Sequence, residues 1–219
     1  MPLNLPKFDK KIYHFGFALG ANTGDFSLNH NIANGSDTSQ TLLGIETERQ
    51  SGFNLGIVTA LHFTDLWSLR FIPALSFSQR NLIYRYLNKG NTNPTIVSKP
   101  IESTYLDFPF YFKFRSHRLN NYAAYLIAGG KYALDLASQQ NVDNNNVAKE
   151  DLVVKISRNN LAAEVGFGFD FFLEYFKLST EIKYTQGINN IHVDDGTFYS
   201  RPIDQIKARM LLFTVSFEG

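Results

Sequence analysis

Hydrophobic and polar side chains alternate strictly along residues 105–115, YLDFPFYFKFR. Every second position is apolar: Leu106, Phe108, Phe110, Phe112 and Phe114. The positions between them carry charges of both signs, two tyrosines and a proline. A period of two is the signature of a β-strand whose two faces meet different environments. The segment therefore predicts a strand with one aromatic face and one charged face.

Seven further segments show this alternation, at residues 13–22, 53–63, 66–86, 122–137, 161–171, 177–185 and 211–217. The connections between consecutive segments alternate between long and short. The long ones are polar and rich in Asn, at residues 23–50, 88–100, 138–160 and 186–205. Eight antiparallel strands with this alternation predict an up-and-down barrel. Strands of this length, with short turns at one end and long loops at the other, are typical of bacterial outer-membrane barrels.

The face opposite the aromatic residues decides between a soluble barrel and a membrane barrel. A soluble lipocalin-like barrel or a sandwich would turn its charged face to water. Sorting positions by parity gathers the charged residues on one face with many Gly, Ala and Ser residues. Signs that nearly balance, interleaved with small side chains, suit the narrow lumen of an eight-stranded barrel. A uniformly large apolar face exposed to water would cause aggregation. We therefore predict an all-β, eight-stranded antiparallel transmembrane barrel with short periplasmic turns and long extracellular loops.

This assignment predicts where particular side chains lie. The expected ion-pair network of the lumen is Arg70, Arg80, Asp107, Lys113, Arg115, Lys131, Asp135, Glu164, Asp170, Glu181 and Lys183. The expected lipid-facing residues include Phe71, Phe108, Phe110, Phe112, Phe167, Phe169 and Phe213. Aromatic residues near strand ends predict an interfacial girdle of Trp67, Tyr84, Tyr86, Tyr122, Tyr132 and Tyr184.

Two details of the backbone are also predicted. Pro73 and Pro109 lie inside expected strands, where each removes one hydrogen-bond donor from the ladder, and we interpret both as bulges or local kinks. Leu152 to Ile156, within the third long loop, could extend a strand beyond the membrane. The whole chain forms one domain, with residues 1–11 as a periplasmic segment and residues 12–219 as the barrel.

Composition narrows the classes of function. The 21 Lys and Arg residues nearly balance 20 Asp and Glu residues, so charge provides no case for a nucleic-acid partner. The chain has no cysteine, which removes disulfides and thiolate metal sites. No run of 18 apolar residues is present to form a transmembrane helix. The first residues, MPLNLPK, lack the apolar stretch of a signal peptide, so we expect a mature form whose export signal has been removed.

No residue pattern predicts catalysis, a cofactor or a metal site. His14 and His62 have lumen parity, His117 lies in a short turn, and His30 and His192 lie in long loops, with no G-x-S-x-G motif nearby. Glu164 and Asp170 are six residues apart on one strand, roughly 20 Å, too far to act on one bond. The Asp194-Asp195-Gly196 segment lacks the further oxygen ligands that calcium requires, so we interpret it as a turn.

Four segments resemble one family of outer-membrane barrels. LPKFDKK at residues 5–11 and HFGFALG at residues 14–20 are similar to the start of mature PorT proteins of Bacteroidota. Residues 105–115 resemble that family's fourth strand, and EIKYTQGINNI at residues 181–191 resembles its seventh strand and the following loop. The resemblance implies a role in the type IX secretion system, which moves folded cargo across the outer membrane and, in gliding species, exports motility adhesins.

The mechanism and the partners stay open at this level. An eight-stranded barrel with a filled lumen is too narrow to pass a protein, so we expect a supporting role beside a larger translocon. The expected partners are outer-membrane lipid, lipopolysaccharide and other secretion components, and Lys7, Lys10 and Lys11 could meet lipid phosphates or a protein. The alternatives are a general structural or adhesion barrel and, from another class, a lipid-modifying enzyme.

Overall fold

The computed structural model describes residues 3–6, 8, 11–90, 92–144 and 147–219. Its strands are β1 (Tyr13–His30), β2 (Gln40–His62), β3 (Trp67–Phe71), β4 (Ala74–Asn88), β5 (Thr95–Arg115), β6 (Tyr122–Asp135), β7 (Asn159–Phe172), β8 (Lys177–Gly187) and β9 (Ile203–Glu218). Two short 3-10 helices, η2 (Ile32–Gly35) and η3 (Lys149–Asp151), lie in the connections. No helix of the described chain is long and apolar enough to cross a membrane.

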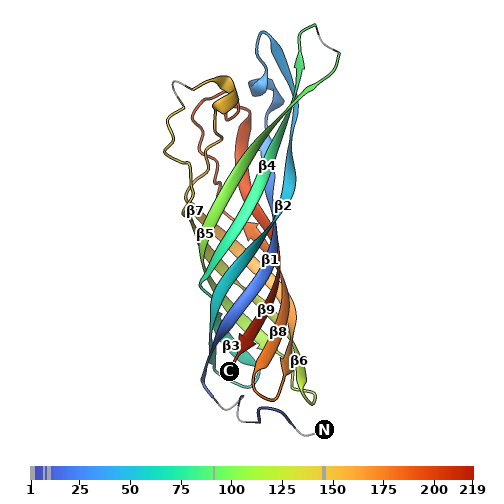
Figure 1. Cartoon of the computed structure of the whole chain (residues 1–219), viewed down its shortest axis with the longest axis vertical. Helices are drawn as coiled ribbons and strands as arrows, with labels where there is room; N and C mark the ends of the chain where they lie inside the picture. Colours follow the sequence, from blue (N-terminus) through green and yellow to red (C-terminus); the bar gives the residue numbers. More distant parts are fainter. Residues whose placement is uncertain (1–2, 7, 9–10, 91, 145–146) are drawn as a thin grey trace.

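The strands close into a barrel in which every pair is antiparallel. The first strand, β1, pairs with β2 on one side and with the last strand, β9, on the other. The short β3 and the longer β4 both lie between β2 and β5, so together they form the third of eight barrel strands. The prediction of eight antiparallel strands is confirmed. Figure 1 shows the resulting tall, strongly tilted barrel, with both termini at the end that carries the short turns.

The interruption between β3 and β4 falls at Pro73. The Pro73 carbonyl still accepts a hydrogen bond from the amide of Ile57 at 3.0 Å, so β2 continues past the break. Pro109 lies on the neighbouring strand β5, beside this break. Its carbonyl accepts a hydrogen bond from the amide of Ile72 at 3.4 Å, and its ring nitrogen has no hydrogen to donate back to the carbonyl of Ile72. The ladder is thus interrupted at Pro73, but β3 and β4 keep one register against β2 and β5, so no bulge forms there. No bulge forms at Pro109 either, because β5 runs through it in register with β6, and the prediction of bulges is wrong at both prolines.

Several strands continue well beyond the length that a membrane requires. The expected loop at 23–50 contains the second half of β1 and the first half of β2, and β5 already begins at Thr95. We call this projecting part the head, comprising residues 24–50, 79–90, 92–103, 138–144, 147–160 and 188–209. The prediction of a strand at 66–86 covers most of the head part of β4. The head parts of β1, β2 and β5 were missed because most of their outward residues are polar, and only scattered inward positions such as Phe26, Leu42 and Ile45 are apolar and buried.

An apolar core fills the head. It contains Phe26, Leu42, Ile45, Leu82, Tyr84, Tyr86, Ile101, Val154, Ile156, Ile191, Tyr199, Ile203, Ile206 and Ala208. Tyr84 and Tyr86 therefore lie inside the head and not in an interfacial girdle, which corrects the prediction for these two residues. The segment around Leu152–Ile156 contributes Val154 and Ile156 to this core, but it forms only a single bridge, between Ile156 and His192, and no strand.

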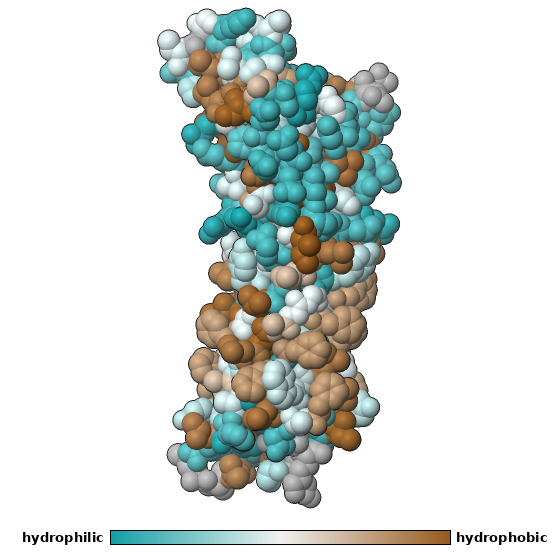
Figure 2. All heavy atoms as spheres, turned by 180° about the vertical axis from the view of Figure 1, so that it is seen from behind, coloured by the Kyte–Doolittle hydropathy of each residue, from teal (hydrophilic) through white to brown (hydrophobic). Residues whose placement is uncertain are grey.

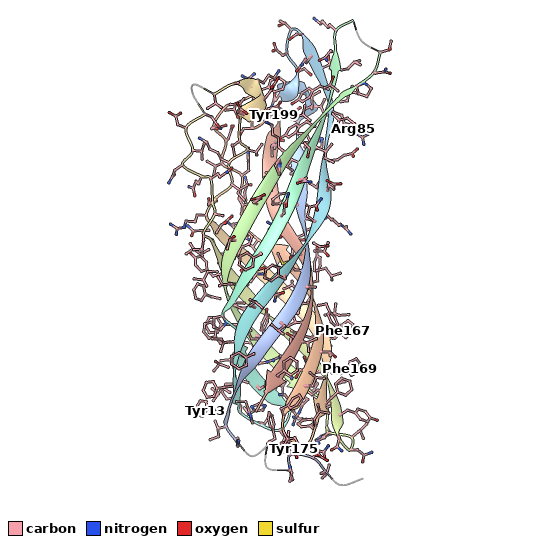
Figure 3. The ribbon with its side chains drawn as sticks, viewed as in Figure 1. Tyr13, Arg85, Phe167, Phe169, Tyr175 and Tyr199 are labelled. Carbon is pink, nitrogen blue, oxygen red and sulfur yellow. The ribbon has the colours of Figure 1, made fainter. Side chains whose placement is uncertain are left out.

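Below the head, the outward-facing side chains form an apolar band. Large apolar residues are exposed on every strand there, and the face seen in Figure 2 is mostly brown in its lower half, above a teal bottom end, and mostly teal in its upper half. Phe167 and Phe169 point away from the barrel in this band, while Arg85 and Tyr199 lie far above it (Figure 3). Each strand contributes roughly 10 residues to the band, the length that a tilted transmembrane strand needs. The long-loop end is assigned to the extracellular side.

The amino-terminal segment covers the short-turn mouth of the barrel. The Asn4 amide donates to Oδ1 of Asn121 at 2.9 Å, and the Asn4 side chain donates to the carbonyl oxygen of Phe172 at 3.0 Å. Phe8 is buried, and its ring stacks on that of His14 with centroids 3.7 Å apart. Lys11 is exposed, whereas Lys7 and Lys10 lie outside the described residues.

Candidate functional site

All eleven charged residues predicted for the lumen are buried inside the barrel. Alternation along each strand turns these side chains inward. Gly and Ala residues at other inward-facing positions leave room for them. Ion pairs divide most of them into a lower group near the short-turn mouth and an upper group near the middle of the barrel. The two groups meet at Tyr111, whose ring lies 5.2 Å from the ammonium of Lys183 and whose hydroxyl donates to Glu164.

Arg70 on β3 is the centre of the lower group. Its guanidinium lies 3.0 Å from the carboxylate of Glu181 and 2.8 Å from that of Glu218, and it also donates to the Ser216 hydroxyl at 3.3 Å. Each carboxylate has a second cation, because Lys183 lies 2.7 Å from Glu181 and Lys177 lies 2.7 Å from Glu218. Charges buried from water are tolerated when they are paired in this way.

Lys113 and Asp170 complete the lower group. The ammonium of Lys113 donates to both oxygens of Asp170 at 2.8 Å, and the Ser179 hydroxyl donates to the same carboxylate at 2.6 Å. The ammonium also lies over the ring of Tyr125, 3.5 Å from its centroid. The Tyr125 hydroxyl donates to Glu181 at 2.9 Å, which connects this pair to the Arg70 cluster.

The upper group is built around Lys131 on β6. Its ammonium lies 3.2 Å from Asp107 and 3.0 Å from Glu164. Glu164 also accepts hydrogen bonds from the hydroxyls of Tyr111 and Thr185. Glu164 and Asp170 thus belong to different groups and bind different lysines, so they do not form a pair for acid–base chemistry.

Three of the predicted residues have other partners. Arg80 has no ion pair within the described chain; its guanidinium donates to the Tyr105 hydroxyl at 3.1 Å and lies over the ring of Phe26. Asp135 accepts from the backbone amides of Thr104 and Ala137 at 3.2 and 3.0 Å. Arg115 donates to the backbone carbonyl of Asp65 at 3.0 Å. Arg80 marks the level at which the charged lumen gives way to the apolar core of the head.

Sequence reasoning missed two charged members of the lower group, Lys177 and Glu218. Both have the right parity, since Lys177 aligns with Ser179 and Glu181, and Glu218 aligns with Thr214 and Ser216. They were overlooked because they occupy the first residue of β8 and the last residue of β9, where the pattern of alternation is short.

The lumen leaves almost no free space. A void of about 20 Å³ lies in the lumen among Ala18, Asn54, Tyr111, Glu164 and Lys183. A void of that size holds about one water molecule. The charged lumen, the apolar core of the head and the amino-terminal cover together close the barrel from end to end.

The predicted lipid-facing residues lie on the outer surface of the apolar band. Phe110, Phe112, Phe167, Phe169 and Phe213 are exposed. Phe71 and Phe108 are partly covered, because the Phe71 ring stacks on that of Phe110 and the Phe108 ring stacks on that of Tyr132.

One cluster in the head contains the residue types of a hydrolase. Nε2 of His192 lies 2.9 Å from Oγ of Ser200, and the Ser200 hydroxyl donates to Asp194 at 3.1 Å. The Ser200 hydroxyl also accepts from the amide of Asp195 at 3.4 Å, so all of its contacts lie within this one loop. Ser200 is also completely buried, and its contacts stabilise the loop.

The other candidate sites also have structural contacts. His14 and His62 lie edge to face at the short-turn mouth, with ring centroids 4.7 Å apart. Asp194 accepts from the amide of Gly196 at 2.9 Å, and Asp195 lies 3.3 Å from the ammonium of Lys155. Within the described residues, no group of three or more His, Asp or Glu side chains is arranged to hold a metal ion.

Comparisons with known proteins agree with this architecture. A family model described as "Outer membrane protein beta-barrel domain" matches residues 9–193. A search of curated protein sequences returns no match.

Solved structures provide more distant likenesses. The outer membrane protein OprG from Pseudomonas aeruginosa is 14% identical, with a TM-score of 0.53, over 94% of this chain and 93% of that protein. Neisserial surface protein A is 13% identical, with a TM-score of 0.43, over 92% and 95% of the two chains. Ail of Yersinia pestis is 13% identical, with a TM-score of 0.40, over 95% and 100%. At these identities the likeness concerns the fold alone, and of these three structures OprG has a TM-score above 0.5.

Proposed function

Because this chain belongs to the outer-membrane protein β-barrel domain family, we propose that it is a non-enzymatic accessory protein of the type IX secretion system. The protein resides in the outer membrane. In this proposal it assists the export of folded cargo, including motility adhesins in gliding species, without conducting the cargo itself. The similarity of residues 5–11, 14–20, 105–115 and 181–191 to the PorT family supports this role.

The filled interior is the observation that carries the accessory role. A void of about 20 Å³ in the lumen leaves no path for a polypeptide, and the two ends of the barrel are closed by different means. Opening such a path would break several buried ion pairs at once, each at a cost of several kcal/mol. Cargo would therefore cross through another component, and this barrel would contact that component through its outer surface.

Deletion of the gene is the direct test. We expect type IX cargo to accumulate in the periplasm of the deletion strain and a plasmid copy to restore export. Normal export from the deletion strain would refute the secretion role. Two plasmid variants would then begin to locate the working surface. One carries the exposed double change Glu46→Lys/Glu48→Lys on the head, and the other carries Glu102→Lys on another strand. The amount of barrel protein in the outer membrane is measured for each variant.

The head favours a second candidate function, that of an adhesion or structural barrel. Its outer wall is polar, and it projects beyond the apolar band on β1, β2, β4 and β5 (Figure 1). If this function is correct, the deletion strain exports cargo normally and loses attachment to a surface or to other cells. Retained attachment together with a periplasmic block in export would exclude it in favour of the secretion role.

A further inference from the structure

A charged row lies directly above the apolar band on one side of the barrel. Leu211 on β9 faces Tyr184 on β8 in the ladder, and both are exposed apolar or aromatic residues of the band. Two residues further along β9, Arg209 faces Asp25 on β1. Arg49 on β2 lies 3.2 Å from the same aspartate. Two outward guanidiniums therefore occupy the level at which the band ends.

The charged row and the top of the apolar band border an open groove of about 430 Å³. Thr23, Asp25 and Arg49 line one side of this groove, and Tyr184, Arg209 and Leu211 line the other. Ligand sites in proteins typically have volumes of roughly 300–1,000 Å³. The lower part of the groove is apolar and belongs to the lipid-facing band, and the rim above it is charged. A ligand that fits the groove therefore has an apolar part, which lies against the band, and a polar part, which lies against the rim.

The charge of the rim favours an anion. The side chain of Arg49 is 74% exposed and uses only Nε to donate to Asp25, so both of its terminal amino groups are without a partner within the described chain. Arg209 uses one terminal amino group to donate to the Ser27 hydroxyl at 2.8 Å. Two guanidiniums thus face one carboxylate.

Other acidic groups near Arg49 are turned to the opposite side. Glu46 is bound by Arg85, at 2.9 Å, and Glu48 accepts from Asn81, at 2.8 Å, both on β4. Lys207, one outward position above Arg209 on β9, adds a further positive charge to the β9 side of the groove.

We propose that this groove binds the phosphorylated headgroup of a glycolipid of the outer leaflet. Arg49 and Arg209 bind the phosphate, because a guanidinium matches phosphate oxygens with two parallel hydrogen bonds. An acyl chain of the same lipid lies along Leu211 and Tyr184 in the band below. The site is independent of the role in secretion, since it concerns how the barrel is seated among lipids.

The test uses the intact protein in micelles of an uncharged detergent, titrated with diphosphorylated lipid A and followed by native mass spectrometry. We expect one lipid A to be retained by the parent protein, and the double change Arg49→Gln/Arg209→Gln to weaken retention at least tenfold. Asp25→Asn should strengthen it, because it removes the carboxylate that competes for Arg49. A control double change, Arg85→Gln/Arg201→Gln, removes the same charge from exposed positions elsewhere on the head and should leave retention unchanged.

Equal retention by the parent and the Arg49→Gln/Arg209→Gln protein would overturn the proposal. Equal retention of lipid A without its phosphates would overturn it as well, because the groove would then bind only acyl chains. If the double variant does not fold, as judged by heat-dependent migration on gels, Asp25→Asn and the single change Arg49→Gln test the same site with opposite expected signs.

Discussion

The guanidinium of Arg70 on β3 lies 2.8 Å from the carboxylate of Glu218 on β9, the penultimate residue of the chain. In the ring of strands, β3 and β9 are separated by β2 and β1, so the contact crosses the lumen. The hydrogen-bond ladder joins these two strands only through their neighbours. The ion pair therefore fixes the end of the closing strand to the opposite wall.

Replacement of Arg70 by Met should destabilise the barrel by about 3–5 kcal/mol, the usual cost of removing one partner from a buried ion pair. The reason is that Glu181 and Glu218 both lose a cation in the interior. Urea unfolding in lipid vesicles would measure the change. Arg85→Met is the control, because its pair with Glu46 is about half exposed on both sides, and we expect a change within about 0.5 kcal/mol. Similar losses for the two variants would contradict a special role for the lumen pair.

Phe167 provides a test of which face meets lipid. Its side chain is 50% exposed in the apolar band, so Phe167→Arg should cost about 2–4 kcal/mol in a bilayer. Ile96 is 62% exposed but belongs to the head, where water surrounds it, and Ile96→Arg should be nearly neutral. The two substitutions introduce the same side chain at exposed strand positions. If they changed the free energy of unfolding by the same amount, the band would not mark the membrane.

The alternation of residues was sufficient to predict the membrane part of the barrel. Positions such as Phe112 and Lys113 differ so strongly that their faces can be assigned from parity alone. The same reasoning failed for the head. There the outward residues include Thr, Glu and Arg, the inward residues are spaced irregularly, and bulges near Gly44 and between Arg49 and Phe53 shift the register. A bulge inverts the parity on one side of it, so a simple count of every second residue cannot follow the strand.

The sequence also did not predict which charged residues of the lumen pair with one another. Parity places Arg80 and Asp135 on the same face as Lys131, but height along the barrel depends on the stagger of all eight strands. Arg80 lies high enough to contact Phe26 of the apolar core, and it also lies over the ring of Tyr105. The position of Phe8 could not be predicted either. A single aromatic residue before the first strand belongs to no periodic pattern, so the sequence does not indicate that its ring covers His14.

Two adjacent glycines on β6 should respond in opposite directions to the same substitution. A Cβ atom at Gly129 would lie 1.9 Å from the backbone carbonyl oxygen of Phe110, whereas at Gly130 the nearest atom is the carbonyl oxygen of Ala162, 3.8 Å away. Gly129→Ala therefore forces β5 and β6 apart and should cost about 1–3 kcal/mol. Gly130→Ala should stabilise the strand by roughly 0.5–1 kcal/mol. Urea unfolding in vesicles measures both, and a loss of stability for Gly130→Ala would show that its outward face is more crowded than the structure indicates.

The bridge between Ile156 and His192 joins the two long loops that cover the head. His192 is partly buried, and desolvation lowers its pKa more than the nearby carboxylates of Asp194 and Asp195 raise it. The neutral ring, whose Nε2 lies 2.9 Å from Oγ of Ser200, is therefore the form that the closed loops prefer.

The closed loops should lose stability as the pH falls below about 6.5, the usual pKa of a histidine in an unfolded chain. Below that value the opened state binds a proton that the closed state resists, whereas above it neither state is protonated and the full stability is present. Hydrogen exchange of residues 147–160 and 188–202, corrected for intrinsic rates, should accordingly show weaker protection at pH 5 than at pH 7.5. His192→Gln cannot titrate, so in that variant the difference between the two pH values should disappear. An unchanged difference would assign the effect to other groups in the head.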